Sequence, residues 1–401
     1  MRQNDLTLLL NIIATILNVL LTIIAFSNWH YLRDTMTNIH NTCKLQKGMG
    51  IGGWLTNYKR FNVLPLNQRL VLTIGDFEHF DSYITQSDID YIASLGLDHI
   101  RLGFDQLVLE ERPGVYRERI LTLLDRFVGW CHAAGLTPVL NLHKAIGNYC
   151  DIPEDVTLFD STELQDRFVD LWLALERHFA GSPDVMFELL NEVRGNAADA
   201  WNRLASRTLA AIRALNPTRT VIIGTANWNS CGDLCRLQLH DDPNVIYTWH
   251  FYSPFEFTHQ QGVLQAAPLF YNRKMPYPGD AERYRDFART VHHQDNAYPG
   301  LKTIDIDWMR QATQPAWDFQ AQHPDKQVWC GEFGTIRHIR TDYRENWMHD
   351  LISLLLEHHT PYCVWNYLST PNDGNRFSLV DDDHRTIVSP RMARIIRGQL
   401  D

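Results

Sequence analysis

Beyond residue 45, short apolar runs alternate with longer segments whose apolar positions recur every three or four residues. The short runs are continuously apolar, as in strands that helices cover on both faces. They predict strands near residues 47–54, 99–104, 138–143, 185–192, 221–224, 245–250, 328–332 and 363–366. Helices are expected over 87–95, 117–134, 197–215, 341–358 and 390–399, with another opening at Ser161. This order predicts an α/β protein with a (β/α)8 TIM barrel rather than a doubly wound sheet.

The stretch from Ser253 to about Leu301 interrupts this repeat. It holds about 50 residues and is rich in Tyr, His, Pro, Arg and Asp. Long loops in compact domains are usually functional or disordered. Because this one follows the sixth predicted strand, we expect a long loop at the C-terminal face of the barrel, where the active sites of such folds are built.

The first 45 residues form a separate apolar segment. Residues 6–26 carry no charge, and none occurs between Asp5 and Arg33. This length is about that needed to cross a bilayer and exceeds the apolar core of most signal peptides. Uncharged polar residues draw one stripe along it at helical spacing: Thr7, Asn11, Thr15, Asn18 and Thr22. We expect an N-terminal apolar helix and linker over 1–45, followed by one domain over 46–401.

Two roles for residues 6–26 stay open. The segment either targets or anchors the chain to a membrane, or it packs as a helix that forms homo-oligomers. The first role predicts a secreted or membrane-anchored protein, and the second a cytoplasmic one.

Composition excludes several classes of protein. The chain has 401 residues and a net charge of −10, so no nucleic-acid partner is expected. The 12 tryptophans suit stacking on flat apolar ligand faces. The seven cysteines contain no CxxC pair; Cys231 and Cys235 are close enough for a local bridge, while Cys330 and Cys363 are expected to be buried thiols.

Known cofactor and metal motifs find little support. Gly48-x-Gly50-x-x-Gly53 matches a dinucleotide fingerprint, but no helix start follows it, as that motif requires. HExxH and GxSxG are absent from the sequence. No cofactor and no metal are therefore expected.

Polar residues cluster instead near the ends of the apolar strands, where the strands of a barrel converge on one mouth. Glu192 ends the fourth strand and Glu332 the seventh. Two carboxylates about 5–5.5 Å apart perform retaining glycoside hydrolysis, provided that one stays protonated and the other ionised. Glu332 is expected near Arg101 and Tyr252, and a guanidinium lowers the pKa of a neighbouring carboxyl group.

The whole constellation resembles glycoside hydrolase family 5, the cellulase-type barrels, over roughly residues 46–400. Asn191-Glu192 and Glu332 match the family's two carboxylate motifs, which implies Glu192 as acid/base and Glu332 as nucleophile. The remaining matches imply substrate-binding residues: Arg101, His143, Asn191, His250, Tyr252 and Trp365. Trp54 or Trp228 is a candidate to extend the sugar-binding track. Asn141 departs from the family, since many relatives carry an acidic residue there.

The resemblance implies a retaining glycoside hydrolase that acts on a β-glucan. An endo-β-1,4-glucanase, or cellulase, is the first expectation. An exo-β-1,3-glucanase or β-glucosidase and a β-mannanase are the alternatives. Exo action would follow if the long loop after the sixth strand closes one end of the cleft. A non-catalytic carbohydrate-binding barrel is the alternative from a different class, although a pure binder has no need for two opposed carboxylates.

Overall fold

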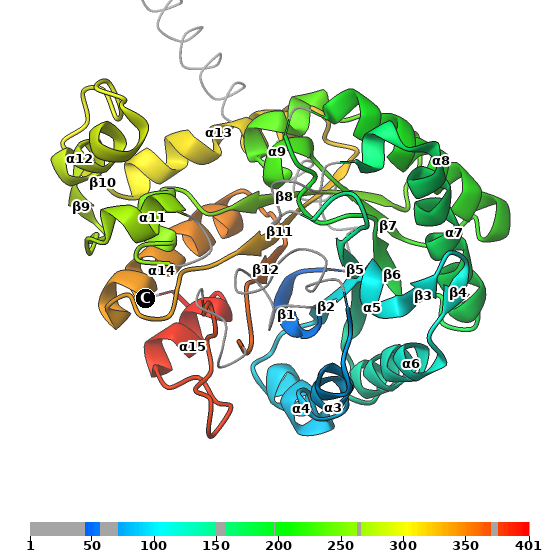
Figure 1. Cartoon of the computed structure of the whole chain (residues 1–401). Helices are drawn as coiled ribbons and strands as arrows, with labels where there is room; N and C mark the ends of the chain where they lie inside the picture. Colours follow the sequence, from blue (N-terminus) through cyan, green and yellow to red (C-terminus); the bar gives the residue numbers. More distant parts are fainter. Residues whose placement is uncertain are drawn as a thin grey trace, which may run out of the picture. The chain divides into compact units, whose positions relative to one another are not determined.

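The computed structural model describes residues 45–56, 71–149, 157–195, 197–262, 266–369 and 376–400. Within this part, eight parallel strands close into a barrel in the order β1, β12, β11, β8, β7, β6, β5, β2 (Figure 1). Their bounds are β1 Lys47–Leu55, β2 His99–Asp105, β5 Thr137–Lys144, β6 Met186–Glu188, β7 Val221–Gly224, β8 Val245–Phe251, β11 Gln327–Phe333 and β12 Tyr362–Val364. The predicted (β/α)8 barrel is confirmed.

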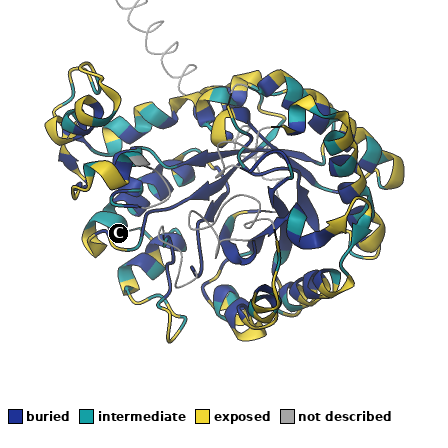
Figure 2. Cartoon of the chain, viewed as in Figure 1, coloured by how far each residue is buried: buried dark blue, intermediate teal, exposed yellow. Residues whose placement is uncertain are grey.

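Helices surround the barrel and pack their apolar faces on it. The larger ones are α3 Ile74–Ser82, α4 Gln86–Ser94, α6 Glu118–Ala133, α7 Thr162–His178, α8 Ala198–Leu215, α13 Ile306–Gln322, α14 Thr341–Glu357 and α15 Pro390–Ile396. In α6, the buried residues recur at helical spacing: Ile120, Leu123, Leu124, Phe127, Val128 and Cys131. Figure 2 shows the consequence, with buried strands at the centre and exposed residues on the outward helix faces.

Short elements complete the connections between strands and helices. These are α5 Gln106–Leu109, the antiparallel pair β3 Glu110–Arg112 and β4 Val115–Tyr116, the 3₁₀ helices at Leu158–Asp160 and Cys231–Arg236, and α9 Ala226–Asn229. Cys231 and Cys235 are both free thiols, so they form no bridge. Cys330 and Cys363 are buried thiols, as expected.

Glycines in β1 make room for side chains from neighbouring strands. A Cβ at Gly48 would collide with the His99 ring. A Cβ at Gly50 would lie 2.6 Å from Cε3 of Trp365, and one at Gly52 would lie 2.5 Å from Cη2 of the same ring. Packing inside the barrel, rather than a dinucleotide, therefore accounts for the glycine-rich sequence of β1.

The long connection after β8 is present where predicted, but it contains regular structure. It carries α10 Phe255–Thr258, α11 Ala266–Tyr271 and α12 Ala281–His292, with a small antiparallel sheet of β9 Gly279–Asp280 and β10 Thr303–Ile304. The next helix, α13, is not predicted by the sequence pattern, since Pro315 lies inside it and proline normally interrupts a helix.

The predicted apolar helix over residues 6–26 lies outside the described residues, as does the segment 1–45 except for Leu45. Among the helices that the structure describes, none combines the length and apolar character needed to cross a membrane.

Candidate active site

The eight predicted site residues lie on, or within four residues after, strands of the barrel. Arg101, His143, His250 and Glu332 belong to β2, β5, β8 and β11, and the other four follow β6, β8 and β12. Hydrogen bonds, ring contacts and the pairing of β8 with β11 join all eight into one group at the C-terminal end of the barrel: Arg101, His143, Asn191, Glu192, His250, Tyr252, Glu332 and Trp365.

Glu332 is held by two donors. Nη1 of Arg101 donates to its Oε2 at 2.5 Å, and the Tyr252 hydroxyl donates to its Oε1 at 2.8 Å. Burial raises the pKa of Tyr252 well above its usual value, so this hydroxyl stays protonated and remains a donor. The two contacts fix the orientation of the carboxylate, as the sequence led us to expect.

The pKa of Glu332 differs from the sequence-based expectation. Burial raises it above the usual value for glutamate, while His250, Arg101 and the Tyr252 hydroxyl oppose this rise. The expected lowering by Arg101 is present, but desolvation of the carboxylate outweighs it. The contact with a permanently charged guanidinium still favours the ionised form of Glu332 at neutral pH.

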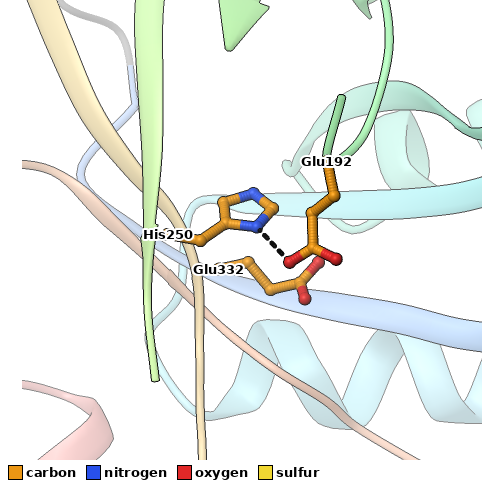
Figure 3. A group of neighbouring side chains, drawn as sticks. All are labelled: Glu192, His250 and Glu332. Atoms are coloured by element: carbon orange, nitrogen blue, oxygen red, sulfur yellow. Dashed lines mark hydrogen bonds and ion pairs between the residues drawn. The ribbon is translucent and has the colours of Figure 1, made fainter. Parts of the chain in front are cut away.

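Glu192 lies opposite Glu332 and adopts a left-handed backbone conformation, with φ of 43°. Its Oε1 is 3.1 Å from Nδ1 of His250 (Figure 3). One oxygen of each carboxylate and a ring nitrogen of His250 lie within 4.8 Å of one another. An approach this short between one oxygen of each carboxylate agrees with the carboxyl-group separation of about 5–5.5 Å in retaining glycosidases.

Two carboxylates and an imidazole are also ligand types for a divalent cation. Here the Arg101 guanidinium already neutralises charge at Glu332 and occupies one of its oxygens. We therefore assign no metal ligand to this group.

Glu188 is a residue that the sequence analysis missed. It is fully buried in β6 and accepts two hydrogen bonds from Arg101, 2.6 Å from Nε and 2.9 Å from Nη2. Although burial alone would lower the pKa of Arg101, the carboxylates of Glu188 and Glu332 raise it, so Arg101 stays a cation. A lone acidic residue inside an apolar strand was the available signal, because such a group needs a buried cation.

His143 and Trp365 form a flat wall of the site. Their rings are parallel, with centroids 5.2 Å apart and planes 5° from each other. The Nδ1 atom of His143 lies 3.0 Å from Oδ1 of Asn141. Asn141 thus offers the ring an acceptor oxygen at the position where the family resemblance implies an acidic residue in many relatives. Burial, aided by Arg101, lowers the pKa of His143 well below its usual value, so the ring is neutral.

The two tryptophans proposed to extend the binding track differ. Trp54 is completely buried, stacks on Trp130 and donates its indole N–H to the Phe80 carbonyl at 2.6 Å. The expectation that it binds sugar is therefore wrong, because its side chain belongs to the core. Trp228 is 43% exposed and lies beside Arg194, whose guanidinium carbon is 5.9 Å from the ring centroid.

Comparisons with known proteins agree with this geometry. The model of the cellulase family, glycosyl hydrolase family 5, matches residues 59–370. Endoglucanase C of Acetivibrio thermocellus is 35% identical over 345 residues, which cover 85% of this chain and 94% of that protein. Cellodextrinase A of Ruminococcus flavefaciens is 32% identical over 317 residues, or 78% of this chain and 82% of that protein. Among solved structures, endoglucanase Cel5A of Thermotoga maritima has the same fold, with a TM-score of 0.66, 22% identity and coverage of 88% and 96% of the two chains.

Proposed function

Because the chain belongs to glycosyl hydrolase family 5, the cellulase family, we propose that it is an endo-β-1,4-glucanase that cleaves β-glucan chains with retention of anomeric configuration. The observation that carries this proposal is the pair Glu192 and Glu332, which face each other within 4.8 Å. Relatives named endoglucanase support the choice of endo action and of a glucan substrate.

In the first step, a Glu332 carboxylate oxygen attacks the anomeric carbon and forms a glycosyl ester. The bond between that carbon and the glycosidic oxygen breaks, and Glu192 gives its proton to the departing oxygen. In the second step, Glu192 takes a proton from water as that water attacks the same carbon, which releases the sugar and regenerates the Glu332 carboxylate.

The surrounding residues stabilise these steps. Arg101 and Tyr252 keep Glu332 oriented and ionised. Arg101 also donates to Oδ1 of Asn191 at 2.7 Å and so orients this amide. We assign Asn191 as the donor to the sugar 2-hydroxyl, a contact that strengthens in the transition state. The Trp365 ring offers its face to a pyranose, and His250 and His143 complete the reactive subsite.

The test combines products with variants. We expect wild-type protein to cleave carboxymethylcellulose and cellopentaose faster than laminarin or glucomannan, and NMR of fresh products to show the β-anomer first. Glu332→Gln should abolish turnover while the protein stays folded. Glu345→Gln is the matched control and should keep activity. Glu345 is a buried glutamate on α14 that contacts Ser389 and Arg391.

Glu192→Ala separates the acid from the nucleophile. It should lose more activity on cellopentaose than on an activated aryl cellobioside, because a good leaving group needs little acid assistance. Added azide should restore turnover of the aryl substrate. Near wild-type activity of Glu332→Gln, or equal losses on both substrates without azide rescue in Glu192→Ala, would contradict the assigned roles.

We also propose that residues 6–26 bind either a second copy of the chain or a membrane. The uncharged length and the polar stripe of this segment support both options.

A further inference from the structure

The connection after β7 turns at three residues that all adopt left-handed backbone: Asn227, Trp228 and Asn229, with φ of 56°, 56° and 53°. Such conformations are costly outside glycine and concentrate at functional sites. Asn227 and Trp228 are exposed, whereas Asn229 is completely buried. The turn therefore directs one polar side chain, that of Asn229, into the interior.

Asn229 lies against the far edge of the His250 ring. Its Nδ2 is 3.1 Å from Nε2 of His250, and the next residue, Ser230, bridges to His250 in the sheet. Gly224 at the end of β7 leaves the space for this amide, because a Cβ there would lie 2.5 Å from Nδ2 of Asn229. Both the strand end and the turn thus hold the amide against the ring.

His250 is a neutral imidazole, because burial, opposed by Glu332 and aided by Arg101, lowers its pKa to about 4. A neutral imidazole has one donor nitrogen and one acceptor nitrogen. Nδ1 faces the Glu192 carboxylate and Nε2 faces the Asn229 amide. An amide nitrogen only donates, and Nδ2 of Asn229 is the atom that faces Nε2, so Nε2 must accept and the single hydrogen of the neutral ring lies on Nδ1, directed at Glu192.

We propose that Asn229 is a positioning residue that holds His250 in the tautomer with hydrogen on Nδ1. This inference rests on the proposed function, in which Glu192 gives a proton to the leaving group. With the other tautomer, Nδ1 would be an acceptor and would compete for the proton that Glu192 must donate. In serine proteases the wrong histidine tautomer lowers turnover by about 10⁴, so tautomer control has a large effect on catalysis.

Substitutions of Asn229 or Asn227 leave the other charged or titratable groups near His250 and Glu192 unchanged. They come from β2, β5, β6, the connection after β6, β8 and β11: Arg101, His143, Glu188, Arg194, Tyr252 and Glu332. A change in pH dependence on altering Asn229 therefore reports the loss of its amide.

The experiment compares Asn229→Gly with Asn227→Gly. Both substitutions suit left-handed backbone, and both delete one amide, but that of Asn227 donates at the surface to Asp233 at 2.9 Å. For Asn229→Gly we expect kcat/KM on cellopentaose to fall about tenfold or more. The basic limb of its pH profile should move to higher pH, since the Glu192 carboxylate loses a donor. Asn227→Gly should stay within about twofold of wild type with unmoved limbs.

A double-mutant cycle with His250→Ala tests whether Asn229 acts through His250. In that background, Asn229→Gly should change kcat/KM by less than about twofold, because the ring it orients is gone. Equal effects of the two glycine variants, an unmoved basic limb, or additive losses in the cycle would overturn the inference. Wild-type protein is assayed in the same series: if it fails to cleave cellopentaose, the proposed function fails, whereas an active wild type with an unmoved limb refutes only the role of Asn229.

Discussion

Substituting Gly50 with alanine tests whether the ring pair of His143 and Trp365, the proposed sugar-binding wall, depends on the bare backbone of β1. The new Cβ would lie 2.6 Å from Cε3 of Trp365, whereas carbon atoms in contact prefer about 3.5–4.0 Å. The ring must therefore move by about 1 Å, and the parallel ring of His143, 5.2 Å away, limits that movement. Overpacking of this kind costs about 1–3 kcal/mol of stability. A misplacement of about 1 Å lowers activity by up to about 10²-fold.

We therefore expect Gly50→Ala to melt a few degrees lower and to lose roughly 10–100-fold in kcat/KM on cellopentaose. Gly129→Ala is the matched control, because Gly129 lies on the exposed face of α6 with no heavy atom within 4 Å of an added Cβ. It should gain about 0.5–1 kcal/mol of stability and keep full activity. A Gly50→Ala protein with wild-type melting temperature and kcat/KM would refute the packing of Trp365 on β1.

Three further predictions concern other parts of the chain. Tyr252→Phe removes a donor that lowers the pKa of Glu332, so the acidic limb of kcat/KM should move to higher pH and its maximum should fall about 10–100-fold; an unmoved limb would contradict this. Glu176→Ala leaves Arg219, which is fully buried, without its carboxylate, and denaturant unfolding should show a loss of about 3–5 kcal/mol; a loss below about 1 kcal/mol would count against it. Deleting residues 1–26 should leave kcat/KM unchanged and alter either the oligomeric state in light scattering or the fraction bound to membranes; no change in either would refute the proposed role of that segment.

The barrel could be predicted because its strands are continuous apolar runs. The position of the active site could be predicted too, because several of these runs end in polar residues. Sequence spacing does not reveal pairs that meet only when the barrel closes. Arg101 and Glu188 are 87 positions apart. Nothing in either apolar run indicates that the two side chains will pair. Trp54 and Trp365 look equivalent in the sequence, yet the first packs under α3 and the second faces the site, because strand register decides which side a residue takes.

The proposed role of Asn229 could not be predicted from the sequence for another reason. Its importance depends on left-handed backbone and on the bare surface of Gly224, and asparagine in a loop is ordinary. Similarly, the 17-residue helix α13 was not predicted, because Pro315 lies inside it. Packing on the barrel overrides the low helix propensity of proline there.

The paired strands β1 and β12 come from opposite ends of the domain. Lys47 to Met49 pair with Tyr362 to Val364, and Trp365 follows directly and packs on the glycines of β1. Contacts between such distant chain segments are entropically expensive to form and tend to arise late in folding. A chain with this seam open would hold both carboxylates but lack the aromatic wall. During refolding, hydrolytic activity should therefore recover later than the helical circular-dichroism signal. The time course of activity would then report when β1 and β12 pair and the barrel closes.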